Sequence, residues 1–318
     1  MLKNSAKLIA DELVARGFTI DEIDTSFYRA TKDDLTFLGE SSKTIVQSSV
    51  VMSACLYKDF TKKFLIKHEI PTSRFKVVDR DNLNEILDLE FPVVVKPLNL
   101  HGGEGVRIGL KDIGEVEKYF RETKYSKIIV EETLIGNDYR ILIVNKKYFA
   151  ACKRVPAFVV GDGIHNIIEL INEENNRRIK KPESFIFPIR IDAELSDVIS
   201  KLPNTNLFIP NSGQRVYVRR NANVSSGGVA IDVTDEVCTS IRELCESIAS
   251  FLGANTLGVD IMTSNINEPL DSQFKAGVVE LNHSPALWLH TNPYIGKRRD
   301  PTKLIVNELL DYLNHNNC

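Results

Sequence analysis

The sequence lacks a long apolar run, and this absence excludes a membrane-spanning helix. Its uninterrupted apolar stretches, such as those at 128–130 and 141–144, fall far short of the ~20 residues that cross a bilayer. The N-terminal segment carries acidic residues, Asp11 and Glu12, inside its apolar pattern. Signal peptides and basic transit peptides lack acidic residues there, so we expect neither membrane association nor export.

The sequence also lacks an excess of either charge and any paired cysteine motif. Lys and Arg number 40 against 43 Asp and Glu, a net charge of -3, so nothing favours binding to nucleic acid. The five cysteines form no CxxC or other zinc spacing. We therefore expect a reduced, cytoplasmic protein, and its 318 residues predict two or three compact units.

Helical and strand patterns alternate along the chain without a Gly/Ser linker. Apolar spacing predicts helices at 4–16, 59–70, 83–87, 113–120, 235–252 and from Asp300 onward. Runs rich in β-branched residues predict strands at 18–24, 91–97, 127–132, 139–155, 258–262 and 276–282, with the third and fourth as neighbours. Residues 157–223 are too long for an ordinary loop, so we expect part of them to fold over a site. The mixture predicts an α+β or α/β architecture.

In the helix after Asp59, which we expect to cap it, the pattern places Phe60, Phe64 and Leu65 on one face.

A glycine-rich loop follows the strand at 91–97. The strand delivers Lys96 to its end, and Gly102, Gly103 and Gly105 come shortly after. Backbone N–H groups of such a loop can approach a phosphate closely, and a lysine adds positive charge. The sequence completes neither GxxxxGK[ST] nor GxGxxG. An ordinary hairpin turn is therefore the alternative interpretation.

Two later strands carry acidic and amide side chains. Glu280 and Asn282 lie two residues apart and share one face of their strand, and antiparallel pairing can bring Asp260 beside them. Carboxylate and amide oxygens are ligands suited to Mg²⁺. The alternative is a polar strand edge that faces solvent.

Taken in order, five segments resemble the ATP-grasp superfamily of carboxylate–amine ligases: VVVKP, HGGEGV, IIVEETLIGNDYR, GVDIM and VVELNHSPAL. The resemblance runs from about Leu56 to the C-terminus. Within the superfamily, the stretches that begin at Arg154 and Tyr217 are similar to the ATP-grasp domain shared by cyanophycin synthetase and bifunctional glutathione synthetase. HSPALW departs from the NPAL-like pattern expected at 283–288.

The resemblance implies an α+β, ATP-grasp fold in which two α+β subdomains sandwich ATP, plus a short N-terminal α/β unit. We expect that unit at 1–55, a lid subdomain with the glycine-rich loop at 56–130, and a nucleotide and metal subdomain at 131–318.

The resemblance also implies roles for individual residues. Lys58 and Lys96 would contact phosphate, Glu131 and the backbone near Thr133 would meet adenine, and Asp138 would meet the ribose. The full implied nucleotide set is Lys58, Lys96, His101, Gly102, Gly103, Gly105, Glu131, Glu132, Thr133, Leu134 and Asp138. The implied metal ligands are Asp260, Glu280 and Asn282, the implied catalytic residues are Arg220, Lys96 and Asn223, and the implied substrate contacts are Arg140, Arg154, His290 and Lys297.

Two of these assignments have plain alternatives. His290, like His283, can equally cap a turn or pack in a core. Lys297 begins a short basic run, residues 297–299, which can equally be a solvated surface.

The implied activity is an ATP-dependent ligation of a carboxylate to an amine through an acyl phosphate, with ADP and phosphate released. The implied cofactors are ATP and Mg²⁺, with Mn²⁺ as the alternative metal. A glutathione-synthetase-like step, joining γ-glutamylcysteine to glycine, is the first candidate. The alternatives are a peptide ligase of the cyanophycin-synthetase type and a non-catalytic ATP-binding subunit. We expect small-molecule carboxylate and amine partners, and either a homodimer or a separate partner ligase subunit stays open.

Overall fold

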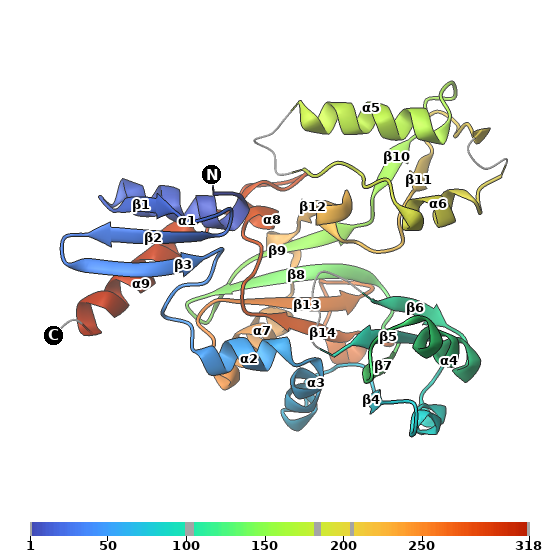
Figure 1. Ribbon diagram of the computed structural model, residues 1–318, viewed down its shortest axis with the longest axis horizontal. Helices are drawn as coiled ribbons and strands as arrows, with labels where there is room; N and C mark the ends of the chain where they lie inside the picture. Colours follow the sequence, from blue (N-terminus) through green and yellow to red (C-terminus); the bar gives the residue numbers. More distant parts are fainter. Residues whose placement is uncertain (1, 99–104, 181–185, 204–206, 317–318) are drawn as a thin grey trace. The chain divides into compact units, whose positions relative to one another are not determined.

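The computed structural model describes residues 2–98, 105–180, 186–203 and 207–316 (Figure 1). The chain forms two compact units. The first comprises Met1–Ala151, Thr234–Leu287 and Pro301–Cys318, and the second comprises Cys152–Val233 and Trp288–Asp300. The subdomain boundaries expected after residues 55 and 130 were drawn from the order of the sequence motifs, whereas these two units are defined by their compactness. The subdomain boundaries therefore stay predictions.

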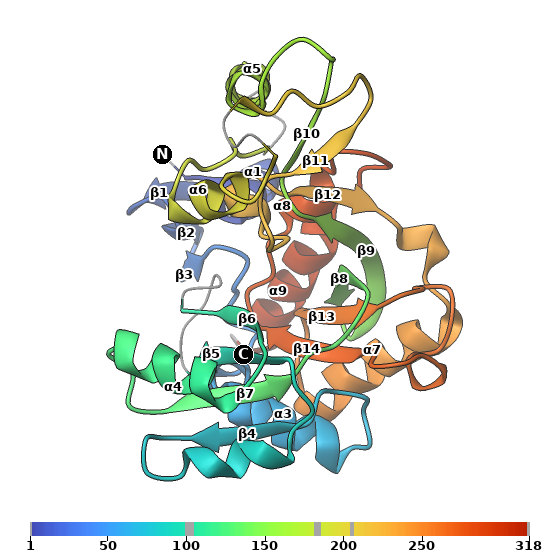
Figure 2. The ribbon, with the colours of Figure 1, turned by 90° about the vertical axis from the view of Figure 1, so that its right-hand side faces the viewer.

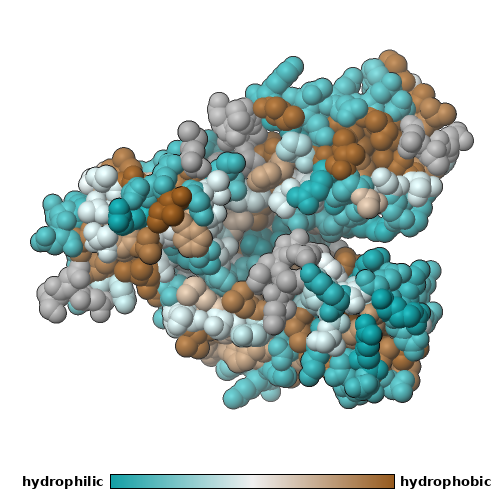
Figure 3. Space-filling model, in the orientation of Figure 1, coloured by the Kyte–Doolittle hydropathy of each residue, from teal (hydrophilic) through white to brown (hydrophobic). Residues whose placement is uncertain are grey.

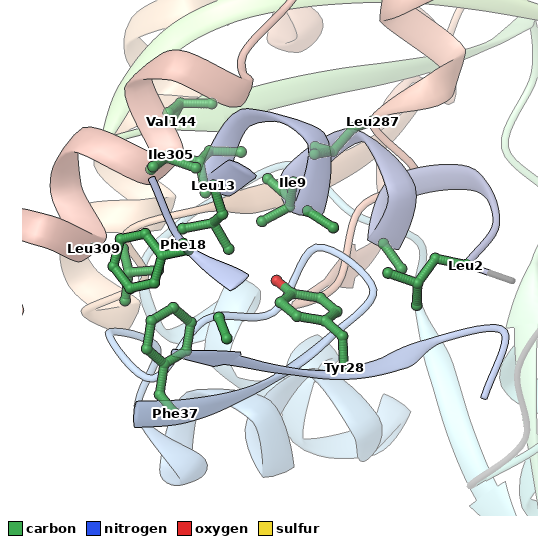
Figure 4. Close-up of a cluster of buried hydrophobic side chains, with 14 of the residues drawn as sticks. Leu2, Ile9, Leu13, Phe18, Tyr28, Phe37, Val144, Leu287, Ile305 and Leu309 are labelled. Atoms are coloured by element: carbon green, nitrogen blue, oxygen red, sulfur yellow. The ribbon is translucent and has the colours of Figure 1, made fainter. Parts of the chain in front are cut away.

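The N-terminal part of the first unit packs a helix on a three-stranded antiparallel sheet. α1 (Asn4–Ala15) precedes β1 (Thr19–Glu22), β2 (Phe27–Lys32) and β3 (Leu35–Glu40), which pair in that order. α9 (Thr302–Asn316) packs against α1. Figure 4 shows their shared core, whose labelled members are Leu2, Ile9, Leu13, Phe18, Tyr28, Phe37, Val144, Leu287, Ile305 and Leu309. Each fully buried aliphatic or aromatic side chain contributes about 1.5–3 kcal/mol to this packing.

A four-stranded antiparallel sheet of the first unit has the order β4–β7–β5–β6. Its strands are β4 (Phe75–Val78), β5 (Val93–Pro97), β6 (Arg107–Leu110) and β7 (Ile128–Glu132). The 3₁₀ helix η1 (Leu83–Asp88) and α4 (Ile113–Glu122) share one apolar core with it. The regular helix expected at 83–87 is therefore a 3₁₀ helix.

A second sheet of the first unit places β8 (Asn137–Val144), β13 (Leu257–Thr263) and β14 (Gly277–Asn282) side by side in antiparallel pairs. β9 (Lys147–Val155) lies on the other side of β8. α7 (Thr239–Leu252) packs against β8. Two short 3₁₀ helices, η5 (Thr234–Glu236) and η6 (Leu270–Ser272), lie in the adjoining connections.

Two helices of the first unit pack against β14: α2 (Ser49–Leu56) and α3 (Lys58–Lys67). The buried residues of α3 are Thr61, Lys62 and Leu65. Phe60 is 45% exposed, and its ring stacks on that of Phe64. Of the three residues expected on one face, Leu65 is buried and Phe64 is half-buried. The expected cap is wrong: Tyr57 is the N-cap of α3, and Asp59 lies inside its first turn.

The second unit begins within β9, whose final residues pair with β12 (Val229–Asp232). β10 (Phe158–Val160) and β11 (Arg215–Tyr217) form a separate two-stranded sheet. The helices of this unit are α5 (Ile167–Ile179), α6 (Ala193–Ile199), η4 (Val224–Ser226) and α8 (Trp288–Thr291). α5 packs against β10 (Figure 2).

Polar and apolar patches alternate on the surface in Figure 3. Val160 and Ile164 are among the exposed apolar residues of the second unit.

Both units combine helices with antiparallel sheets, which confirms the α+β prediction. One expected strand neighbourhood is wrong: β7 pairs with β4 and β5, whereas β8 pairs with β13 in the other sheet. Gly136, with φ of +128°, directs the chain between the two sheets, and a Cβ there would lie 2.2 Å from the Thr263 carbonyl carbon. Only glycine tolerates that backbone approach. Among the described residues, no helix is both long and apolar enough to cross a bilayer.

Candidate functional site

The expected acidic cluster assembles on β13 and β14. The two strands pair with Asp260 opposite Glu280 and Gly258 opposite Asn282. The Asn282 amide nitrogen lies 3.4 Å from Glu280 Oε1, so these side chains share one face of the sheet. The juxtaposition predicted from period-two alternation and antiparallel pairing is therefore present.

Arg140 lies beside this cluster on β8. It is in register with Asp260, and both side chains are buried. The guanidinium engages both carboxylate oxygens: Nε donates to Oδ1 and Nη2 donates to Oδ2 at 3.1 Å. Gly258 leaves room for it, because a Cβ at that position would lie 3.1 Å from Arg140 Nη1. Such a bidentate pair fixes the orientation of the Asp260 carboxylate.

The donor set on these strands fits a hard divalent cation. Asp260, Glu280 and Asn282 offer carboxylate and amide oxygens, the ligand type that Mg²⁺ and Mn²⁺ prefer. Arg140 compensates part of the negative charge of this cluster, because its guanidinium engages both oxygens of Asp260. The residues present can therefore hold such an ion.

Lys58 lies at the start of α3, next to the acidic strand. It lines a small pocket of the first unit whose other lining residues are Cys55, Thr61, Val279, Glu280, Leu281 and Asn282. Burial lowers the pKa of the Lys58 ammonium, although the attraction of Glu280 opposes this shift. The two predicted phosphate and metal residues, Lys58 and Glu280, therefore meet at one pocket.

Lys96 ends β5 and forms a buried ion pair with Glu131 of β7, with Nζ 3.1 Å from Oε1. Burial opposes the charge of the Lys96 ammonium, but the attraction of Glu131 and Glu280 outweighs it and raises the pKa of Lys96. Burial likewise opposes the charge of Glu131, yet Lys62 and Lys96 lower the pKa of its carboxyl to about 2. The pair is therefore fully ionised at neutral pH.

Lys62 is a site residue that the sequence analysis missed. Its side chain is 1% exposed, and its Nζ lies 3.0 Å from Glu131 Oε2, the oxygen opposite the one that Lys96 contacts. The available signal was its position: it lies four residues after Lys58 and three before the buried Leu65, so it shares their side of α3. A lysine on a buried helix face calls for an acidic partner.

The residues expected around adenine and ribose lie at the end of β7 and the start of β8. Glu132 Oε1 accepts hydrogen bonds from Arg74 Nη1 at 3.0 Å and from the Glu90 backbone at 2.9 Å. Thr133 Oγ1 donates to the Pro92 carbonyl at 2.7 Å. Leu134 is half-buried in the connection that follows, and Asp138 lies on β8 opposite Met262. The side chains of Glu131, Glu132 and Thr133 thus hold protein groups, and their nucleotide roles stay predictions.

The glycine-rich segment joins two antiparallel neighbours, β5 and β6. His101, Gly102 and Gly103 lie outside the described residues. Gly105 has a φ of +69°, and its carbonyl accepts a hydrogen bond from the Tyr119 hydroxyl at 2.7 Å. A hairpin connection and a phosphate-binding loop are compatible with this arrangement.

Arg154, Arg220 and Asn223 belong to the second unit. Arg154 lies on β9 opposite Ala230. Arg220 is 53% exposed and forms an ion pair with Asp197 of α6. Asn223 caps η4, since its side chain accepts from the Ser225 backbone at 3.0 Å. Their predicted roles at phosphate and substrate stay predictions.

His290 and Lys297 also belong to the second unit. His290 is buried in α8, and Lys297 is exposed. The backbone N–H of Lys297 donates to Asp232 Oδ2 at 3.2 Å. The same oxygen accepts from Arg299 Nη2 at 3.4 Å, so part of the basic run is held by an acid of its own unit.

The first unit therefore brings together most of the charged residues that the sequence singled out. Electrostatic interactions link five of them, Lys58, Lys96, Glu131, Asp260 and Glu280, both to one another and to Lys62. This arrangement suits a highly charged anionic ligand accompanied by a divalent cation.

Comparisons with known proteins place this geometry in a family. The model of the phosphoribosylglycinamide synthetase ATP-grasp (A) domain matches residues 57–156. The glutathione biosynthesis bifunctional protein of Listeria monocytogenes is 32% identical over an alignment of 327 residues, and this alignment covers 97% of the present chain. The chain belongs to the ATP-grasp superfamily. The resemblance inferred from the five sequence motifs is confirmed.

Two further relatives of this ATP-grasp chain agree. Cyanophycin synthetase of Trichormus variabilis is 31% identical over 259 residues, which cover 79% of the chain. The crystal structure of a bifunctional glutathione synthetase from Pasteurella multocida superposes with a TM-score of 0.69 at 25% identity and covers 97% of the chain. The chain spans 41% of the Listeria protein, 29% of the cyanophycin synthetase and 43% of the Pasteurella chain.

Proposed function

We propose that the chain is an ATP-dependent carboxylate–amine ligase that forms an amide bond through an acyl phosphate and releases ADP and phosphate. The observation that carries the proposal is the pairing of Asp260 with Glu280 next to Lys58, in a chain of the ATP-grasp superfamily. A site that had lost its activity would be free to lose these buried and half-buried charges, because withdrawing charged groups from water is costly. The intact set therefore argues against a non-catalytic ATP-binding subunit.

The chemistry of this site follows from where negative charge accumulates. A carboxylate is a poor electrophile until its oxygen is phosphorylated. Phosphorylation concentrates negative charge on phosphate oxygens, and the later attack by the amine puts charge on the acyl oxygen and, as the C–O bond breaks, on the departing phosphate. Lys58 and Lys96 are charged groups already in place to stabilise that charge, commonly the largest catalytic contribution. A divalent cation, Mg²⁺ or alternatively Mn²⁺, held by Asp260, Glu280 and Asn282 would supply Lewis-acid stabilisation of the same oxygens.

A glutathione-synthetase-like step, in which glycine is joined to γ-glutamylcysteine, is our first proposal for the substrates. The support is that the relatives covering 97% of the chain are named for glutathione biosynthesis and glutathione synthesis. The second candidate is a peptide ligase of the cyanophycin-synthetase type, which a relative covering 79% of the chain supports. We retain this second candidate because HSPALW at 283–288 departs from the NPAL-like pattern expected there.

The test is release of ADP and phosphate by the purified chain against a matched panel of acids and amines. The γ-glutamylcysteine and glycine pair is compared with each compound alone and with aspartate–arginine peptides. We expect amide product and phosphate in equal amounts only when both members of the correct pair are present. Turnover with other pairs and none with γ-glutamyl compounds would reject the first substrate proposal. Cytoplasmic location, a homodimer and a separate ligase subunit remain predictions.

A further inference from the structure

Lys62 has the contacts of a fully engaged buried ammonium. Its Nζ donates to Thr72 Oγ1 and Ser73 Oγ at 2.8 Å each and lies 3.0 Å from Glu131 Oε2. A lysine ammonium has three N–H donors, and these three acceptors use all of them. Its partners are themselves anchored, since Thr72 Oγ1 donates to the Val278 carbonyl of β14 at 2.7 Å and Ser73 Oγ donates to Glu131 Oε2 at 2.9 Å.

Glu131 is thereby held at both ends of its carboxylate. Oε1 contacts Lys96, while Oε2 contacts Lys62 and Ser73. Neither rotation nor displacement of the carboxylate can occur without breaking one of these contacts. Since Lys96 pairs with the remaining oxygen, the place of its ammonium depends on the network that Lys62 completes.

The charge balance of this group also depends on Lys62. One carboxylate shared by two ammonium groups leaves a net positive charge at Glu131, whereas a single Lys96–Glu131 pair would be neutral. A neutral pair attracts phosphate weakly, because its two charges cancel beyond a few ångströms. A packing role alone would be served better by an apolar side chain, which avoids the cost of burying a charge.

We propose that Lys62 is a positioning residue for ATP: through Glu131 it fixes the Lys96 ammonium and keeps the lysine–glutamate group net positive. The inference rests on the proposed function and adds a residue to it. Lys62 is 1% exposed and does not line the pocket that Lys58 and Glu280 share, so it acts through Glu131 rather than by touching a ligand.

The test compares Lys62→Met with Lys63→Met. Lys63 is the next residue on α3, is 66% exposed and pairs with Asp59 at 3.0 Å. Nucleotide binding is measured directly with ATP and Mg²⁺ by calorimetry, and KM and kcat are measured separately for ATP and for the carboxylate substrate. For Lys62→Met we expect the Kd and KM for ATP to rise about 10- to 100-fold, the range typical of groups that support a binding residue. The KM for the carboxylate substrate and all constants of Lys63→Met should stay near wild type.

A double variant controls for the buried charge that Lys62→Met leaves behind. In Lys62→Met/Glu131→Gln no uncompensated carboxylate remains, so this protein tests the proposal even if the single variant does not fold. Because the positioning role acts through Glu131, adding Lys62→Met to Glu131→Gln should weaken ATP binding by much less than the 10- to 100-fold expected for Lys62→Met alone, since only the loss of one positive charge remains. Independent, additive losses would overturn the proposal.

The outcomes separate this inference from the proposed function. If the wild type binds ATP and Lys62→Met binds it equally well, the positioning role is wrong and the ligase proposal stands. If ATP binding depends on Lys62 but no acid and amine pair yields an amide, the positioning role stands and the ligase proposal fails. A wild-type chain that binds no ATP would overturn both.

Discussion

At the scale of single residues, the site depends on carboxylates whose orientation is fixed by cations. Asp260 accepts hydrogen bonds from Nε and Nη2 of Arg140, and the Glu131 carboxylate lies between the ammonium groups of Lys62 and Lys96. Glu280 differs, since it lies at the pocket beside Lys58 and is not enclosed by a bidentate partner among the contacts described. It is therefore the carboxylate best placed to reach a ligand directly.

Changing Glu280 to Gln removes its charge and keeps its size. We expect kcat for ligation to fall about 100-fold, since the loss of one preorganised electrostatic contact commonly costs this much, and the Mg²⁺ concentration for half-maximal activity to rise. Phosphate release measured across a Mg²⁺ titration checks both effects. Glu268→Gln is the matched control, because Glu268 is exposed and its side chain accepts a hydrogen bond from the Asn265 amide at 2.8 Å. An active Glu280→Gln protein with unchanged Mg²⁺ dependence would contradict the proposed mechanism.

The sequence predicted these residues unevenly. Asp260, Glu280 and Asn282 could be placed together because strand alternation and antiparallel pairing are strictly geometric. Lys62 could not, because the apolar pattern of α3 favoured the face of Phe60 and Phe64. Aromatic rings that stack on each other at the surface look, in a sequence, like rings that are buried.

At the scale of elements, the positions of the strands were predicted better than the pairing between strands. The runs at 91–97, 258–262 and 276–282 formed strands because β-branched residues fit a buried sheet. Sheet membership was not predictable, since it depends on single backbone features such as the turn at Gly136. The β2–β3 hairpin was missed for a related reason: its turn uses Asp33 with positive φ, followed by another aspartate, instead of the Asn-Gly or Asp-Gly pair that signals such turns.

The helix α9 contains a carboxyl group that makes its packing depend on pH. Burial raises the pKa of Glu308 to about 7, and Lys146 opposes this shift only in part. A pKa that is higher in the folded state than in the unfolded state means that the protonated form favours folding. The free energy of unfolding therefore decreases as pH rises from about 4.5 to about 7, and it levels off above that range.

Glu308→Gln should remove this dependence. We expect the variant to be more stable than wild type by on the order of 1 kcal/mol at pH 8, because solvent screening reduces the effect of a half-exposed group. At pH 4, where the wild-type carboxyl is protonated in both states, the two proteins should be equally stable. Urea unfolding at both pH values checks the prediction. A stability difference that is the same at pH 4 and pH 8 would contradict it.

At the scale of the whole molecule, the composition and the site describe different properties. A net charge of -3 conceals a local concentration of lysines in the first unit, so the balance that argues against nucleic acid does not argue against a polyphosphate. The ATP-grasp fold was predictable from motif order, whereas the division into compact units was not. Compactness depends on contacts between distant segments such as residues 234–287 and the N-terminal half.

Ligand binding should be visible as a change in the stability of the whole chain. A ligand that binds only the folded state raises the free energy of unfolding by about 2.7 kcal/mol at 100 times its Kd. We expect ATP with Mg²⁺ to raise the melting temperature, EDTA to abolish most of the shift, and GTP at equal concentration to give a smaller one. Differential scanning fluorimetry checks all three. The same shift with and without EDTA would argue against a metal-assisted nucleotide site.

The contact between α1 and α9 has a consequence for how this chain is made on the ribosome. Ile9 and Leu13 near the beginning share one core with Ile305 and Leu309, which are translated far later (Figure 4). The sheet of residues 19–40 therefore leaves the ribosome long before α9 and keeps an uncovered apolar face until residues 302–316 have been synthesised. During that interval the nascent chain exposes apolar surface of the kind that chaperones bind, and a product truncated before residue 302 would lack the helix that completes the core of α1 and this sheet.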